Sequence, residues 1–152
     1  MTKTNYYLGI ALAVSKKSTC LKKQYGAVIV KDDEVIATGY NDTCRKEPHC
    51  TTCTKPSGNG DMSEYSVCPA VHAEMNAIIS ASRKEMLGAD LYLAGYDAVT
   101  SEENIEARPC EICLRLIKNA GIDRVINRTG IIYERWEDGI LYDLKRGYKA
   151  YD

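Results

Sequence analysis

The cysteine content limits what this chain can fold into more than any other feature of its sequence. The chain has 152 residues, with seven cysteines and two histidines. An odd number of cysteines cannot all pair within one chain, and the sequence after Met1 shows no secretory signal pattern. We therefore expect a cytoplasmic protein with reduced thiols. Cysteines in that setting indicate metal binding or redox chemistry.

Length and composition narrow the class of protein further. A chain of 152 residues suits one domain, which we place over residues 1–152. The formal net charge is −1, whereas domains dedicated to nucleic acid have a strongly basic surface. No apolar run approaches the roughly 20 residues that a membrane span needs. We expect neither nucleic acid nor a membrane as a partner.

Hydrophobic periodicity predicts an α/β fold, in which helices cover a sheet. The predicted elements are helix 6–18, strands 26–30 and 35–39, a helix from Pro69 or Val71 to about Arg83, strand 91–94, helix 110–119, strand 125–126 and strand 131–133. The strand–helix–strand order from 91 to 127 predicts a parallel pair with a right-handed crossover. Residues 136–148 are partly helical in this interpretation. Residues 41–69 break every period and form a long cysteine-rich loop, for which a bound metal would explain an ordered structure.

Two short motifs indicate the chemistry. One is His72-Ala73-Glu74, and the other is Pro109-Cys110-Glu111-Ile112-Cys113. Each is weak alone, because His-x-Glu is common at helix starts and Cys-x-x-Cys also occurs in redox pairs and structural zinc sites. In this order, and at two predicted helix starts, they match the signature of zinc nucleobase deaminases.

The residue types suit that chemistry. A catalytic zinc takes three protein ligands and leaves one position for water. His72 supplies a nitrogen, and Cys110 and Cys113, three residues apart, supply thiolates from one face of a helical turn. A helix N-terminus lowers thiol pKa values. Glu74 is then available to move protons between water, the base and the leaving amine.

The chain resembles the cytidine and deoxycytidylate deaminase superfamily from about residue 15 to residue 126, and its deoxycytidylate (dCMP) deaminase branch most. The further matching segments are Ser18-Thr19-Cys20, Gly26-Ala27-Val28-Ile29-Val30, Thr38-Gly39-Tyr40-Asn41 and His72-Ala73-Glu74-Met75-Asn76-Ala77-Ile78. The resemblance implies a three-layer α/β/α fold around a mixed five-stranded sheet. It implies zinc-dependent hydrolysis of dCMP, a nucleotide, to dUMP and ammonia, and a sugar contact by Asn41. It also implies a homo-oligomer, a hexamer in many relatives, that responds to dCTP and dTTP with Mg²⁺.

Five further cysteines and His49 raise the question of a second metal. Several dCMP deaminases hold a structural zinc in the corresponding loop, and their pattern selects Cys20, Cys50, Cys53 and Cys68 here. Cys44 and His49 are then spare, although either could replace a member of this quartet. The alternative is that Cys20 and Cys68 are small buried hydrophobic residues.

The chain departs from the family between strand 91–94 and Pro109. In relatives only a few residues separate these points, whereas here residues 94–108 intervene and include Asp97, Glu102, Glu103 and Glu106. This segment is either a solvated excursion or a part of the pocket or of an oligomer contact. Because the identity of the substrate depends on the shape of the pocket, other classes of function stay open. These are a deaminase of another cytosine nucleotide, a nucleoside or a free base, a tRNA adenosine deaminase, and a non-catalytic zinc or redox module.

Overall fold

The computed structural model describes residues 1–55, 67–135, 140–143 and 148–151. One sheet forms its centre, with the strand order β2-β1-β5-β6-β7-β8-β9. The helices are α1 (Lys3–Ser15), α3 (Ala73–Ile79), α4 (Arg83–Met86) and α5 (Glu111–Ala120). The strands of this sheet are β1 (Lys23–Lys31), β2 (Glu34–Tyr40), β5 (Asp90–Asp97), β6 (Arg124–Asn127), β7 (Gly130–Arg135), β8 (Ile140–Asp143) and β9 (Tyr148–Tyr151). A small second sheet pairs β3 (Asp42–Thr43) with β4 (Ala70–Val71).

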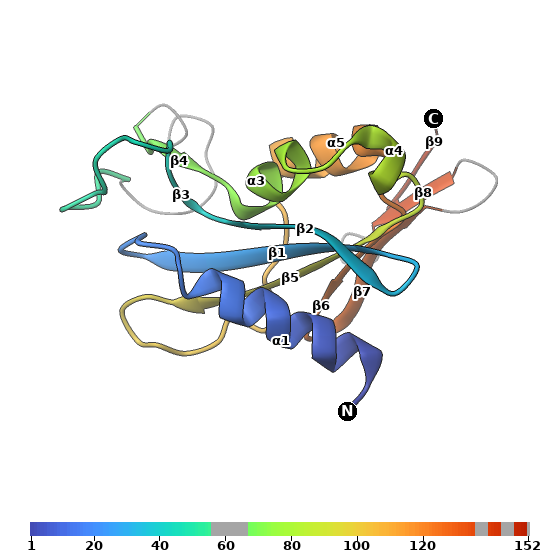
Figure 1. The fold of residues 1–152 in the computed structure, drawn as a ribbon, viewed down its shortest axis with the longest axis horizontal. Coiled ribbons are helices and arrows are strands. Elements are labelled where there is room, and N and C mark those ends of the chain that lie inside the picture. The colour runs from blue at the N-terminus through green and yellow to red at the C-terminus, as the bar shows by residue number, and fades with distance from the viewer. Residues whose placement is uncertain (56–66, 136–139, 144–147, 152) are drawn as a thin grey trace.

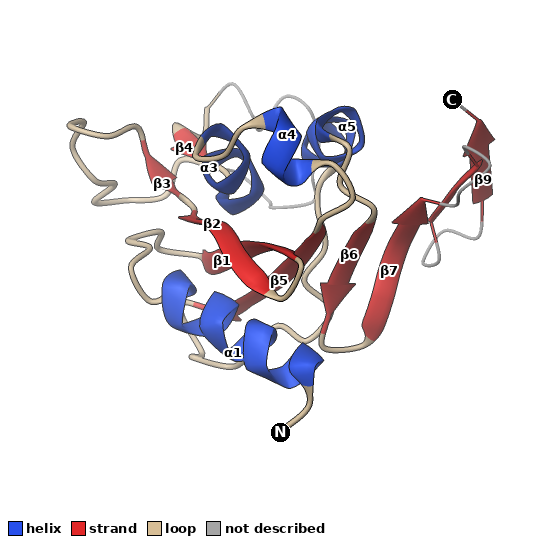
Figure 2. Ribbon diagram, turned by 45° about the vertical axis from the view of Figure 1, so that its right-hand side comes forward, coloured by secondary structure: helices blue, strands red, loops and turns tan. Residues whose placement is uncertain are grey.

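The sheet is mixed, as the resemblance implied. Strands β5 and β6 are parallel, which confirms the predicted parallel pair. The remaining neighbours are antiparallel. The expected five-stranded core consists of β2, β1, β5, β6 and β7. Strands β8 and β9 extend the sheet beyond β7 (Figure 2).

Helices cover both faces of the sheet, which gives the three layers predicted. Helix α1 lies on one face, and α3, α4 and α5 lie on the other (Figure 1). The alternation of side chains along β1 explains this arrangement, because successive residues of a strand point to opposite faces. Val28 and Val30 join the apolar cluster under α1, whereas Ala27 and Ile29 join the cluster under α3 and α5.

The predicted hairpin is present, and its turn has a clear cause. Asp32 and Asp33 both have positive φ values, 51° and 62°, which two-residue hairpin turns require and aspartate tolerates better than most residues. The first helix begins three residues before its predicted start. Thr2 caps it by accepting a hydrogen bond from the Asn5 amide at 3.1 Å.

Two predicted helices are wrong in extent. The helix predicted to reach Arg83 ends at Ile79, and α4 begins separately after Ser82. Ser82 explains the break. Its hydroxyl accepts a hydrogen bond from the Glu85 amide at 3.2 Å, and this cap begins a new helix. The prediction of partly helical structure over 136–148 is wrong for residues 140–143. These residues form β8, paired with β7 and β9, while 136–139 and 144–147 lie outside the described residues.

No helix in the described part of the chain is both long and apolar enough to cross a bilayer.

Candidate metal centre

Three side chains from two helix starts meet on the face of the sheet under α3 and α5. The Nδ1 atom of His72 lies 3.2 Å from the Cys113 sulfur and 3.5 Å from the Cys110 sulfur. One ligand atom from each residue lies within 4.8 Å of the other two. Sequence motifs that are about forty residues apart therefore come together in space.

The local backbone explains why these side chains converge. His72 and Cys110 are the N-cap residues of α3 and α5, and both have extended backbone conformations with ψ values of 156° and 171°. The His72 side chain makes no capping hydrogen bond. The Cys110 sulfur accepts from the Cys113 amide at 3.4 Å, so it lies at the positive end of α5. The motifs thus occupy the two helix starts that the sequence predicted, and Gly121 ends α5 with φ of 84°.

Electrostatics favour a cation between these three residues. Cys113 is fully buried, and its contact with Cys110, together with burial, raises the pKa of the Cys113 thiol. The hydrogen bond with Cys110 raises the pKa of the His72 imidazole. Thiol and imidazole groups crowded in this way hold protons until a divalent cation replaces them. One nitrogen and two sulfurs are a ligand set that zinc prefers, with a fourth position left for water.

Glu74 lies beside this centre in the first turn of α3 and is 5 % exposed. Burial raises the pKa of its carboxyl group. A buried carboxyl group with a raised pKa is suited to accept and return protons.

Comparison with known proteins gives the family. Residues 1–129 match the family model described as the cytidine and deoxycytidylate deaminase zinc-binding region. The chain belongs to this family. A deoxycytidylate deaminase of Mycobacterium phage D29 is 39 % identical over 127 residues, which are 80 % of this chain and 90 % of that protein. One from Schizosaccharomyces pombe is 32 % identical over 82 % of this chain, but this match spans only 36 % of the yeast protein.

Solved structures agree with this assignment. The apo dCMP deaminase from the cyanophage S-TIM5 is 25 % identical to this member of the family and superposes with a TM-score of 0.58. The match covers 81 % of this chain and 79 % of that one. The same cyanophage protein has been solved with dCMP and dUMP.

The four cysteines predicted as a second site of this deaminase-family chain line one small cavity. They come from the connection between α1 and β1, the cysteine-rich loop and the segment before β4, and are Cys20, Cys50, Cys53 and Cys68. Burial and the nearby thiols raise the pKa of Cys50. Among the described residues, however, only the trio at the helix starts has its ligand atoms within 4.8 Å of one another. Neither Cys44 nor His49 lines this cavity.

The Asn41 side chain forms hydrogen bonds with the backbone of β1 in this structure. Its Oδ1 atom accepts from the Tyr25 amide at 2.7 Å, and its Nδ2 atom donates to the Lys23 carbonyl at 2.8 Å. Asn41 is 8 % exposed. Its amide therefore joins the end of β2 to β1, and its predicted contact with a sugar stays a prediction.

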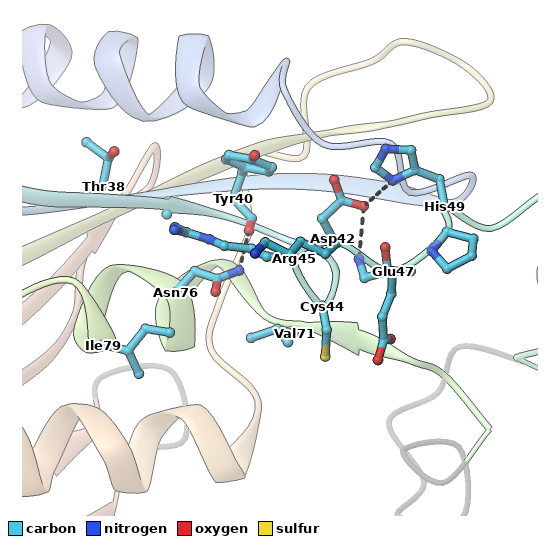
Figure 3. Close-up of a pocket in the computed structure, with 14 residues that line it drawn as sticks. Thr38, Tyr40, Asp42, Cys44, Arg45, Glu47, His49, Val71, Asn76 and Ile79 are labelled. Carbon is cyan, nitrogen blue, oxygen red and sulfur yellow. Dashed lines mark hydrogen bonds and ion pairs between the residues drawn. The ribbon is translucent and has the colours of Figure 1, made fainter.

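A larger, open cavity of about 850 Å³ lies between residues 42–49 and α3. Figure 3 shows Asn76 donating to the Tyr40 carbonyl, at 2.8 Å, and Asp42 paired with His49 at 3.3 Å. Arg45, Lys46 and Glu47 also line it. Charges of both signs border this cavity, and none of the three candidate ligands lines it.

Sequence reasoning missed two polar side chains on the same face of the sheet as the candidate metal centre. Tyr25, at the start of β1, packs against the apolar cluster that contains Ala73 and Ala107. Asn104, in the segment between β5 and Pro109, donates to the Tyr25 hydroxyl at 3.2 Å. No local pattern signals this pair, because the two residues are 79 positions apart.

Proposed function

We propose that this chain is a zinc-dependent deaminase that hydrolyses dCMP to dUMP and ammonia, a step of pyrimidine deoxynucleotide metabolism. The observation that supports this most is the buried Glu74 carboxyl group beside three convergent metal-ligand side chains. A bare structural zinc site would have no use for that carboxyl group. The names of the phage and yeast relatives and of the cyanophage structure support dCMP as the substrate.

In this proposal His72, Cys110 and Cys113 would hold the ion. A zinc ion there acts as a Lewis acid and lowers the pKa of water, so that water can react near neutral pH. Glu74 accepts a proton from the water that attacks the pyrimidine carbon bearing the amino group. It passes this proton to the adjacent ring nitrogen. It then accepts the remaining proton of the added hydroxyl group, which becomes the carbonyl of dUMP, and delivers that proton to the departing amine. One water is consumed, and one ammonia is released.

A panel of substrates tests the assignment. Loss of absorbance on deamination should be compared for dCMP, CMP, dCTP, deoxycytidine and guanine at equal concentration. We expect kcat/KM for dCMP to exceed the others by at least about tenfold, since one well-made polar contact discriminates by roughly that factor. Preference for deoxycytidine or guanine would point to a nucleoside or base deaminase. Absence of activity on all five, with activity on tRNA in a separate assay, would point to an editing enzyme.

We also propose a structural zinc held by Cys20, Cys50, Cys53 and Cys68, supported by their shared cavity. Metal analysis should then find two zinc ions per chain, and Cys53→Ser should reduce this number to one. Because the ion would anchor the loop rather than react, Cys53→Ser should retain at least about a tenth of the activity but speed proteolysis within residues 41–69. Cys44→Ser is the matched control, since Cys44 is exposed and lies outside this cavity. One zinc per chain in the unmodified protein would refute the second site.

The family resemblance supports three further proposals, namely a homo-oligomer, a nucleotide effector bound with Mg²⁺ and a cytoplasmic location. Light scattering with and without dCTP, dTTP and Mg²⁺ tests the first two.

A further inference from the structure

The segment that this chain has between β5 and Pro109 is an ordered structure. Asp97 caps its first turn, and its Oδ1 atom accepts from the amides of Val99 and Thr100 at 2.9 and 3.0 Å. Tyr96 and Glu103 form a β-bridge that returns the chain alongside β5. Residues 97–108 are therefore anchored to the end of β5 by a single bridge and by turn hydrogen bonds, and they do not form a loose excursion.

Two contacts fasten this segment to the strand that follows α5. Glu103 pairs with Arg128 through two hydrogen bonds of 2.9 and 3.2 Å. The buried Asn127 side chain donates to the Ala107 carbonyl at 2.8 Å. A bidentate pair and a buried hydrogen bond fix orientation as well as distance. The segment is thus held on both sides immediately before the cysteines of α5.

Asn104 is the fixed point within this segment. Its backbone N–H donates to the Gly95 carbonyl at 2.8 Å, and its backbone carbonyl accepts from the Ala107 N–H at 3.2 Å. Its Oδ1 atom accepts from the Glu106 amide at 3.2 Å. These contacts orient the remaining group, Nδ2, which donates to the Tyr25 hydroxyl oxygen at 3.2 Å.

Tyr25 is well placed for a role in the site. Its ring lies across Gly95, where an added Cβ atom would be 2.5 Å from the Tyr25 Cδ1 atom. Its backbone amide donates to Asn41 Oδ1, and its side chain packs against the apolar cluster that includes Ala73, the residue between His72 and Glu74 in the sequence. Burial raises the pKa of the Tyr25 hydroxyl, and the nearby Glu74 charge adds to the rise. The hydroxyl therefore keeps its proton at neutral pH.

We propose that Tyr25 is a substrate-binding residue of this site and that Asn104 is its positioning residue. This inference rests on the proposed function. Because Asn104 donates to the Tyr25 oxygen, the hydroxyl proton is directed elsewhere, and it is available to an oxygen atom of the nucleotide. Residues 97–108 thereby contribute to substrate selection through a residue on β1.

The test compares Tyr25→Phe, Asn104→Ala and the double variant by steady-state kinetics with dCMP and by binding of dUMP. Tyr96→Phe is the matched control, since Tyr96 is the neighbour of Gly95 on β5 and contacts Lys16 instead, 3.6 Å from the ring centroid. We expect Tyr25→Phe to raise KM and the Kd for dUMP about tenfold, with kcat within about threefold of the unmodified enzyme. Asn104→Ala should raise KM about threefold, and the double variant should resemble Tyr25→Phe.

The outcomes separate the possible roles. If the effect of Tyr25→Phe is absent with deoxycytidine, the hydroxyl binds the phosphate, and if it persists, the hydroxyl binds the sugar or base; both results support the proposal. Unchanged KM and Kd in Tyr25→Phe overturn it, as does a double variant whose losses multiply. Lower melting temperatures without a change in KM would make the pair structural and also overturn it. Absence of deamination by the unmodified protein would instead refute the proposed function.

Discussion

Glu74→Gln should lower kcat for dCMP by at least about a thousandfold while zinc content stays unchanged. A positioned general acid–base typically contributes about 10²–10⁴-fold, and Glu74 acts at more than one proton transfer in the proposed mechanism. Glutamine keeps the size and hydrogen bonding of the side chain but cannot accept the proton. Stopped assays for dUMP, with metal analysis of the same preparation, measure both quantities.

The same substitution should leave the melting temperature unchanged or raise it. Burial of the Glu74 carboxyl group raises its pKa, so its charged form is unfavourable in the folded state. Glu34→Gln is the matched control, because Glu34 is exposed at the hairpin and should retain full activity. A Glu74→Gln enzyme with more than a tenth of normal activity would contradict the assigned role.

Cys113→Ser should remove one zinc per chain and reduce activity to the background of the assay. Cys113 is fully buried, and its sulfur lies 3.2 Å from His72, so its loss removes one of the three convergent ligand atoms. A serine hydroxyl is a poor zinc ligand, and three protein ligands are the usual minimum for a catalytic site. The loss should therefore exceed that of any substitution that leaves the ion bound.

Metal analysis and thermal unfolding distinguish this result from general misfolding. Cys113→Ser should melt at a lower temperature than the unmodified protein, and added zinc should not restore it, because metal binding contributes to folding stability. Cys44→Ser should keep its zinc, activity and melting temperature. A Cys113→Ser protein with full zinc content and activity would place the ion elsewhere.

The sequence predicted the parts of this molecule that depend on local patterns. The short apolar, β-branched runs at 26–30 and 35–39 and the charged turn between them predict a hairpin, and the structure confirms it. The candidate ligand residues followed from short motifs, because His-x-Glu and Cys-x-x-Cys each lie within one helical turn. Their placement at helix starts was also predictable, because Pro109 favours the beginning of a helix.

The remaining features depend on contacts between distant segments. The helix after His72 ends early because Ser80 and Ser82 bond to the local backbone, and periodicity does not register this competition. Residues 140–143 form a strand because neighbouring strands pair with them. The hydrogen bond between Tyr25 and Asn104 depends on how residues 97–108 fold back along β5. This path is determined by tertiary contacts and not by a local pattern.

Both helices of the candidate metal centre begin at a candidate ligand residue, and this limits how such a protein can change over generations. An inserted residue inside either motif would rotate the next side chain by about 100° around the helix axis and remove a ligand. Insertions before His72 or Cys110 leave the helix starts intact, since loops tolerate changes in length. The cysteine-rich loop and residues 97–108 lie at those two places. Insertions and substitutions at these two places can therefore change which substrate is bound while the residues of the reaction stay in place.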